Sequence, residues 1–341
     1  MTFLAIFFAL LFEQVRPLGA HSPPHQLARL WVQQVLRGFD AGQHSTARLA
    51  WVLIVLLPAF LATLAHHLLR MGDNWMGWGV LFALHVAVLY MTLGFRQFSA
   101  YFSNIRDALD AGDEPSARAT LRAWAYTTPD AELPQRSDIL RCALAQASAS
   151  AHIHVFGVML AYSLGVLLGL GPAGAVTYRM GELLARSCNQ QNKQYPQNQQ
   201  DQHNSAPGAE PAPAALGAKH PISTPMQNLS QNAWHLLNWL PTRVTALLFA
   251  IVGNFEDAIA CWRAQTQQAV TAQQKQDNNQ IIISAAAGAI GVQMGLEPQT
   301  NGSSNLNQPQ LGHLQAMVGL VWRAVVVAMT FLALMTIAGI A

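Results

Sequence analysis

The stretch LAWVLIVLLPAFLATLAHHLL, residues 49–69, contains no acidic residue, lysine or arginine and decides the fold. It matches the roughly 20 apolar residues that a helix needs to cross the hydrocarbon core of a bilayer. Residues 75–95, 153–176 and 324–341 form further runs of similar length and character. A chain with such runs is predicted to be an all-α, polytopic integral membrane protein.

Two weaker apolar segments lie at residues 1–12 and 236–253. The first has no basic region and no convincing small-residue cleavage site, so it is predicted to be an uncleaved helix rather than a signal peptide. The second contains Pro241 and Arg243. Because proline breaks the helical hydrogen-bond pattern, a short, tilted or re-entrant helix is expected there. The sequence therefore predicts about six membrane segments in a helix bundle.

The composition supports the lipid bilayer as the main partner, because 52% of the residues are hydrophobic and only 11% are charged. The formal charge of +2 is too small and too dispersed for a nucleic-acid surface. Cys142, Cys188 and Cys261 are widely spaced and predict neither a disulfide framework nor a zinc site. His152 and His154 are two residues apart and would not share a helix face, so no metal site is predicted.

Arginines are distributed unevenly around the predicted spans. Four lie between the first two spans and six between residues 96 and 141, whereas Arg70 alone separates the second span from the third. Cytoplasmic loops carry the excess of basic residues. Residues 14–48 and 96–152 are therefore expected in the cytoplasm, with the N-terminus and the 189–232 loop on the other side of the membrane.

The chain is predicted to have three parts. Residues 1–188 hold the N-terminal membrane helices and a cytoplasmic amphipathic hairpin at about 96–127, where apolar residues recur at helical spacing around a break at Gly112. Residues 189–232 are rich in Gln, Asn, Pro, Ala and Ser and predict a disordered linker. Residues 233–341 hold the C-terminal membrane segments.

The segment NWLPTRVT, residues 238–245, places an amide, a proline and a guanidinium in an apolar run. A charge in hydrocarbon is costly, so Arg243 faces a protein interior, reaches to the interface or holds an anion. An interfacial arginine and a polar site at the mouth of the bundle both remain open. Glu256 and Asp257 could meet Arg243 or Arg263 at the end of this helix, or simply form the acidic start of the next helix.

Three segments resemble the CobD/CbiB family of cobalamin-biosynthesis membrane proteins. Residues 238–248 (NWLPTRVTALL) are similar to the family's N-x-x-P-A-R-L-T-A-L-L signature. Residues 171–179 (GPAGAVTYR) resemble its G-x-x-G-A-x-x-Y-R segment, and residues 285–292 (AAAGAIGV) its A-A-M-A-G-A-L-G segment. These three segments and the hairpin occur in the same order as in the family and together span most of the chain.

The resemblance implies an adenosylcobinamide-phosphate synthase, a ligase that joins aminopropanol or its phosphate to a corrinoid propionate as an amide. It implies a site for a corrinoid or a small anionic ligand in which Arg179 and Arg243 hold phosphate or propionate. Glu182 is the candidate catalytic acid. The remaining candidate ligand-binding residues are Tyr178, Asn238, Thr245, Glu256 and Asp257.

Several acids of the family pattern are missing. Where the family has Y-R-x-x-N-T-L-D, residues 178–185 read YRMGELLA, with Glu182 for the asparagine and Ala185 for the aspartate. Ile283 replaces the acid of N-A-G-W-P-E, and Phe156 that of E-N-x-x-D-G. Because the reaction needs preorganised charge around the activated carboxyl group, this loss argues against the synthase mechanism.

The ends of the chain, at residues 1–13, 237–243 and 334–339, resemble AmpE, an inner-membrane protein of the same superfamily associated with β-lactamase induction. Two functions therefore stay open. One is a divergent, corrinoid-linked ligase, and the other is a non-enzymatic sensor or regulator of the cell envelope. The cofactor, the metal or nucleotide requirement and the oligomeric state remain open.

Overall fold

The computed structural model describes residues 2–16, 22–71, 75–124, 135–204, 222–271, 277–295 and 306–339. Within these ranges the chain is helical, and its β-structure is limited to an isolated bridge between Val292 and Asn307. The expectation of an all-α protein is confirmed for this part of the chain. The helices are α1 (Thr2–Val15), α2 (Pro23–Phe39), α3 (His44–Trp51), η1 (Val52–Leu56), α4 (Leu57–Arg70), α5 (Trp75–Thr92), α6 (Phe95–Asp110), α7 (Glu114–Trp124), α8 (Arg136–Ala151), η2 (His152–Phe156), α9 (Gly157–Leu167), α10 (Ala173–Asn204), α11 (Thr224–Leu237), α12 (Trp239–Val252), α13 (Phe255–Thr271), α14 (Asn278–Ile290) and α15 (Leu311–Ile337).

Three of the described helical segments are long and apolar enough to cross a membrane. They are α3–η1–α4 (His44–Arg70), α8–η2–α9 (Arg136–Leu167) and α15 (Leu311–Ile337). The pair α11–α12, bent by 43°, would make a fourth if it counts as one span. Helix α1 and the apolar part of α5, Met76–Thr92, are shorter. The structure therefore supports three or four candidate spans, and the expected six are not shown.

The predicted bounds of two spans were wrong. The run at 153–176 is divided, because α9 ends at Leu167 and α10 begins at Ala173. Gly169 and Gly171 turn the chain here with φ of 75° and 62°, a backbone region that glycine adopts at little cost. The turn also contains Leu168 and Leu170, so hydropathy alone does not mark it. At the other end of the chain, α15 begins at Leu311 instead of residue 324.

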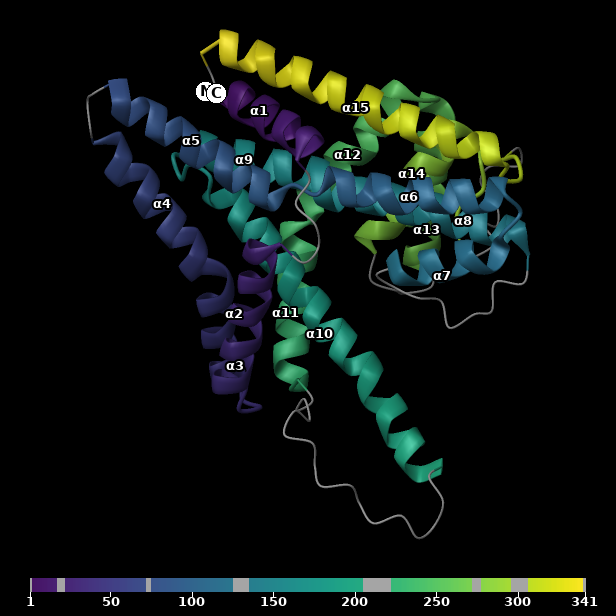
Figure 1. Ribbon diagram of the computed structural model, residues 1–341, viewed down its shortest axis with the longest axis horizontal. Helices are drawn as coiled ribbons and strands as arrows, with labels where there is room; N and C mark the ends of the chain where they lie inside the picture. Colours follow the sequence, from purple (N-terminus) through teal and green to yellow (C-terminus); the bar gives the residue numbers. More distant parts are fainter. Residues whose placement is uncertain are drawn as a thin grey trace.

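The segment α8–η2–α9 forms the centre of the bundle. In its most apolar window 72% of the residues are buried inside the molecule, against 28% in α3–η1–α4 and in α15. Small residues allow neighbouring helices to approach closely. A Cβ built on Gly174 of α10 would lie 2.0 Å from the carbonyl oxygen of Ala161 in α9. Around this centre, α15 lies alongside α1 at one side of the molecule, and the two chain ends are adjacent (Figure 1).

Helices α6 and α7 lie in the region where the sequence predicted a hairpin at 96–127, although residues 125–127 fall outside the described ranges. The chain turns at Gly112, whose φ is 77°. Asp113 then caps α7 by accepting a hydrogen bond from the backbone N–H of Ser116 at 3.1 Å. Phe102, Ile105 and Leu109 are buried in the main core cluster. The apolar stripe of α6 therefore packs into the bundle, as its spacing indicated.

The predicted linker at 189–232 needs correction, because both of its ends are helical. Helix α10 continues to Asn204 and α11 begins at Thr224, while residues 205–221 lie outside the described ranges. Ser223 caps α11, and its N–H donates to Asp40 Oδ2 at 2.8 Å. Met226 and Ser230, also within the predicted linker, are buried. A composition poor in large apolar residues thus did not prevent packing at this end.

Candidate functional site

A buried polar cluster lies where α11 bends into α12. Its members are almost completely shielded from solvent, and we call it the polar core, made of His152, Tyr178, Asn238, Thr242 and Thr245. Asn238 Oδ1 accepts hydrogen bonds from Tyr178 Oη at 2.8 Å and from His152 Nε2 at 2.9 Å. The Thr242 hydroxyl donates to the backbone carbonyl of Asn238 at 2.6 Å. Helices α10 and η2 therefore meet at the side chain of Asn238, and α12 bonds the backbone carbonyl of the same residue.

The hydrogen bonds of the polar core fix the protonation of His152. Because Nε2 faces the Asn238 Oδ1 acceptor, it carries the proton. Nδ1 is then an acceptor for the Thr245 hydroxyl, at 2.9 Å. The ring is satisfied on both sides as a neutral imidazole, which suits a buried position. By contrast, Asn238 Nδ2 is buried with no hydrogen-bond partner among the described residues, so the cluster holds a donor that a ligand or water acceptor would satisfy.

A second cluster begins one residue after Tyr178. Arg179 Nη1 donates to His154 Nδ1 at 2.9 Å and to Glu182 Oε2 at 3.2 Å. A cavity of about 180 Å³ opens beside these residues. We call it the arginine pocket; its lining residues include His25 and Arg29 of α2, His154 of η2, and Arg179, Glu182 and Arg186 of α10. Burial, together with the nearby charges of Arg179 and Arg29, lowers the pKa of His25 from 6.5 to about 4.

The π-helical turn η2 explains how two nearby histidines serve different clusters. His152 reaches α12 through Asn238 and Thr245, whereas His154 reaches α10 through Arg179. Such turns insert an extra residue into a helix and are frequent at functional sites. The expectation that these histidines would not share a helix face agrees with these contacts. Their membership of the two clusters was not predicted. Two histidines in an otherwise apolar run do, however, indicate a buried polar site.

The candidate residues named from the sequence divide into four groups. Tyr178, Asn238 and Thr245 lie in the polar core, and Arg179 and Glu182 line the arginine pocket. The hydrogen bond and the ring contact given for Arg243 are both with Trp239. Its Nη1 donates to the carbonyl oxygen of Trp239 at 2.9 Å, and its guanidinium carbon lies 4.1 Å from the centre of the Trp239 ring. This contact is typical of an interfacial arginine that covers an apolar surface.

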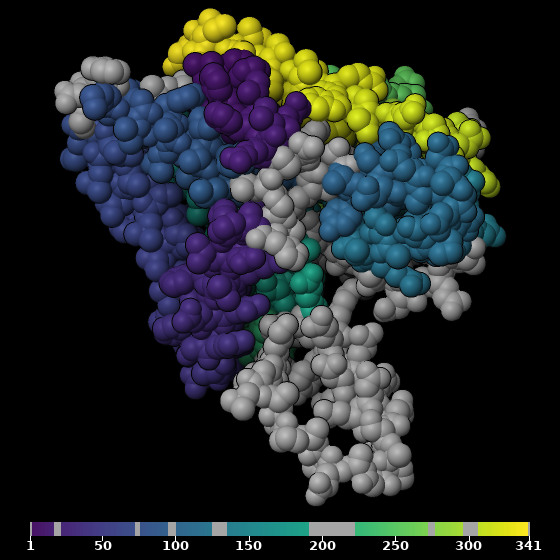
Figure 2. Space-filling view, viewed as in Figure 1, coloured from purple at the N-terminus to yellow at the C-terminus, as the bar shows by residue number. Residues whose placement is uncertain are grey.

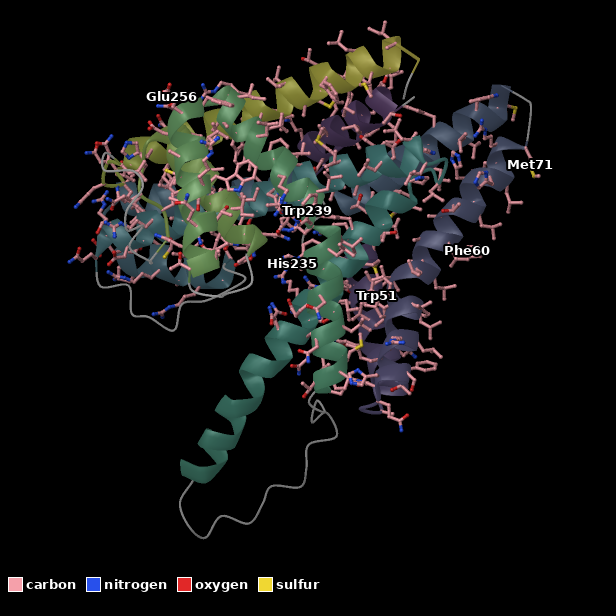
Figure 3. All side chains as sticks on the ribbon, turned by 180° about the vertical axis from the view of Figure 1, so that it is seen from behind. Trp51, Phe60, Met71, His235, Trp239 and Glu256 are labelled. Carbon is pink, nitrogen blue, oxygen red and sulfur yellow. The ribbon has the colours of Figure 1, made fainter. Side chains whose placement is uncertain are left out.

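Glu256 and Asp257 lie at the exposed start of α13. Asn254 Nδ2 donates to Asp257 Oδ2 at 2.6 Å, and the Asp257 N–H donates to Asn254 Oδ1 at 3.3 Å. These reciprocal bonds form a helix cap. Figure 3 shows Glu256 far from His235 and Trp239, which flank the bend at Asn238. The two acids are therefore placed as the acidic start of a helix rather than with the polar core.

The positions at which the family pattern has acids are apolar and packed. Phe156 is 4% exposed and meets the Phe249 ring edge-on, with ring centroids 5.6 Å apart. Ala185 is also 4% exposed, and Ile283 packs against the main core cluster. Within the described ranges, no group of three or more His, Cys, Asp or Glu side chains is arranged to hold a metal ion. The charged side chains of the described site are those that line the arginine pocket: Arg29, Arg179, Glu182 and Arg186.

Comparison with known proteins points to one group of relatives. The chain is 24% identical over 341 residues to the cobalamin biosynthesis protein CobD of Stutzerimonas stutzeri (strain A1501), a match that covers 95% of this chain and 94% of the relative. It is 25% identical over 216 residues to the cobalamin biosynthesis protein CobD of Chromobacterium violaceum, covering 62% of this chain and 54% of the relative. No protein-family model and no solved structure matches it. The chain is thus a divergent, CobD-like relative of the cobalamin-biosynthesis proteins.

Proposed function

We propose that this protein is a multi-pass membrane protein of corrinoid metabolism that binds a corrinoid or a small anionic ligand without forming the amide bond. The observation that carries the proposal is the chemistry of the polar core. Tyr178, Asn238 and His152 form a neutral, internally hydrogen-bonded cluster, and Phe156 stands where the family pattern has an acid. Such a site offers hydrogen bonds to a ligand but little negative charge for an activated acyl group.

A membrane location is supported by the outer surfaces of the candidate spans. Figure 3 shows Phe60 of α4, and Met71 directly after this helix, on the outer side of the molecule. Helices α4 and α15 expose several large apolar side chains, including Phe60, Leu61, Leu64, Leu68, Phe331 and Leu334. Such a surface is far more apolar than a water-facing one and fits contact with lipid. The multi-pass location in a bacterial inner membrane is what the resemblance to the CobD/CbiB family and AmpE implies, and it is part of this proposal.

Ligand recognition by the polar core depends on the unpartnered amide of Asn238. A buried donor without an acceptor costs free energy, so an acceptor on the ligand is favoured there. The amide and propionate side chains of a corrinoid carry acceptor oxygens of this kind.

The test is growth of a strain that lacks its authentic synthase and depends on cobalamin made from early corrinoid precursors. We expect no rescue by this protein, even when it is present in the membrane fraction at the level of a rescuing synthase. In parallel, the purified protein should bind cobinamide in a spectroscopic titration, and Asn238→Leu should weaken that binding by about tenfold, the loss expected for one buried hydrogen bond.

Robust growth at native expression would overturn the binding-only proposal and assign the ligase activity to the chain. Absence of cobinamide binding by the folded wild-type protein would overturn the corrinoid link. The AmpE-like sensor would then be the function to test, because its prediction rests on the resemblance of residues 1–13, 237–243 and 334–339 and requires no corrinoid. Both matched relatives are described as cobalamin biosynthesis proteins, so the corrinoid function is placed first.

A further inference from the structure

The arginine pocket carries more positive charge than its ion pair requires. Arg29, Arg179 and Arg186 all line it, against the single carboxylate of Glu182. The ion pair between Arg179 and Glu182 has side chains that are only 16% and 7% exposed. Arg29 adds a further positive charge beside the same cavity. This excess favours occupation by an anion, since nearby positive charges in a partly buried site are stabilised by a counter-charge.

The geometry around Arg179 suits a ligand with several acceptor oxygens. Both hydrogen bonds given for its side chain, to His154 and to Glu182, use Nη1. Guanidinium has five N–H donors in a fixed fork. Nη2 and Nε are thus not engaged by these two bonds. His154 accepts through Nδ1, and together with Glu182 it fixes the orientation of the fork before any ligand arrives.

The size of the cavity limits what enters it. At about 180 Å³, it has room for a phosphate group with a short substituent, given that one water takes up about 30 Å³ of the liquid. A complete corrinoid ring system would not fit inside. The occupant is therefore a small anionic group, or the anionic end of a larger molecule whose remainder lies outside the pocket.

The wall formed by α2 indicates where that larger molecule lies. On the helix that contributes His25 and Arg29, the outward side chains Leu27 and Leu30 are 66% and 57% exposed. Figure 2 shows the α2–α3 segment at the outer face of the molecule. Met91, at the end of α5, lines the pocket and is itself 47% exposed. An amphipathic helix with exposed leucines beside a basic cavity fits the headgroup layer of a membrane.

We propose that the arginine pocket binds a phosphate group, supplied by the headgroup of an anionic phospholipid whose acyl chains lie along the exposed apolar side chains of α2 and Met91. Arg179 and Arg29 hold the phosphate oxygens, and α2 forms the outer wall of the site. This site does not depend on corrinoid binding at the polar core. A phosphate ester from solution shares the same chemistry, so the test must separate the two sources.

The test uses the full-length protein in detergent micelles, with bound lipid counted by native mass spectrometry. Phosphatidic acid is the probe, phosphatidylcholine, whose zwitterionic headgroup has no net charge, is the comparison, and inorganic phosphate is the competitor. We expect one tightly retained phosphatidic acid per chain, weak retention of phosphatidylcholine and little displacement by millimolar phosphate. Arg29→Gln should lower the affinity for phosphatidic acid by about tenfold, as expected for loss of one charge-assisted hydrogen bond.

Arg37→Gln is the matched control, because Arg37 is an exposed arginine on the same helix that is absent from the pocket lining. Its effect should stay within about twofold, because an exposed charge contributes little. Arg179→Lys keeps the charge but loses the planar fork, and it should weaken binding without unfolding the protein.

Equal retention of both lipids, or equal effects of the Arg29 and Arg37 variants, would overturn the proposal. Displacement of the lipid by inorganic phosphate at low concentration would overturn the lipid source and assign the pocket to a soluble phosphate. Failure to bind cobinamide leaves these measurements unaffected, so the two proposals fail separately.

Discussion

The hydroxyl of Tyr178 occupies the space that a side chain at position 157 would need. A Cβ built on Gly157 would lie 2.1 Å from Tyr178 Oη, far inside contact distance. The same oxygen donates to Asn238 Oδ1 at 2.8 Å. Gly157 therefore makes room for the hydrogen bond that joins α10 to the start of α12, and the absence of a side chain in α9 becomes a requirement of the polar core.

Replacing Gly157 by alanine should destabilise the protein by about 1–3 kcal/mol, the usual cost of overpacking a filled interior. The change is measured as a shift in the unfolding midpoint when SDS is added to detergent micelles. Gly319→Ala in α15 is the control, because nothing lies within 4 Å of the added Cβ. It should be neutral or stabilising by less than about 1 kcal/mol, since alanine favours a helix. Equal shifts for both variants would show that position 157 is not crowded.

His152 and Asn238 should behave as one energetic unit. His152→Leu leaves the Asn238 oxygen and the Thr245 hydroxyl with one partner fewer, and each single change is expected to cost about 1–3 kcal/mol. In the double variant with Asn238→Leu the loss should be smaller than the sum, with a coupling energy of about 0.5–3 kcal/mol.

Thr330→Ala supplies the control for that cycle, because its hydroxyl donates to the Val326 carbonyl of its own exposed helix segment. Its effect should add to that of His152→Leu. Additivity of the His152 and Asn238 changes, measured in the same mixed-micelle unfolding assay, would contradict a shared polar core.

Acid should weaken the packing of α2 through His25. The pKa of this imidazole is lowered from 6.5 to about 4, first by burial and then by Arg179 and Arg29. The unfolded chain therefore binds a proton before the folded chain does. Stability due to this group is fully present above pH 6.5 and falls as the pH drops toward 4. His25→Gln should reduce this dependence, and NMR of labelled histidine should report the pKa directly.

Charges around His25 determine how the variants should respond. Arg29, Arg179 and Arg186 line the cavity beside it with Glu182, and Ser22 Oγ lies 2.7 Å from its Nδ1. Arg29→Gln should raise the pKa of His25, because it removes one of the positive charges that oppose protonation. A pKa near 6.5 in the wild-type protein, or no rise in the variant, would contradict the structure of the pocket.

The sequence predicted the helical class and the place of the hairpin because both depend on local patterns. Hydrophobic runs identify apolar helices, and Gly112 with Asp113 marks a helix end and a helix start. The turn at 168–172 escaped prediction because its leucines continue the apolar run, while its glycines act through backbone conformation. The segment 136–151 escaped too, because alanine and serine make it look weakly apolar although small side chains let it occupy the centre of the bundle.

The site was predicted only in part, for a related reason. Tyr178 and Arg179 are adjacent in sequence, yet one faces the polar core and the other the arginine pocket. Arg243 carries the strongest motif signal, but its contact with Trp239 lies within one helix. Which side of a helix faces which partner depends on tertiary packing. His152, for example, bonds Asn238, which is 86 residues away from it in sequence.

Two deletions of equal length within the predicted linker should differ in their effect on expression and stability. Removal of residues 205–220 should leave expression and the unfolding midpoint nearly unchanged, because the Gly-, Pro- and Ala-rich composition supplies little packing and loop closure depends only weakly on length. Removal of residues 216–231 should lower both. It takes away the Ser223 cap, which binds Asp40 at the end of α2 through its N–H and its hydroxyl.

The second deletion also removes the first half of α11, including Met226 and Ser230, which are 0% and 1% exposed. Loss of a buried methionine alone costs about 2–5 kcal/mol when it is truncated to alanine, so the α2–α11 contact should not survive. Asp40→Ala tests that contact without changing chain length and should lower the midpoint by a smaller amount. Expression is measured by fluorescence-detected size-exclusion chromatography, and the unfolding midpoint is measured by SDS titration. If the two deletions behave alike, the helical start at Thr224 does not contribute to the packing of the bundle, and the whole 189–232 segment acts as the linker that its composition predicted.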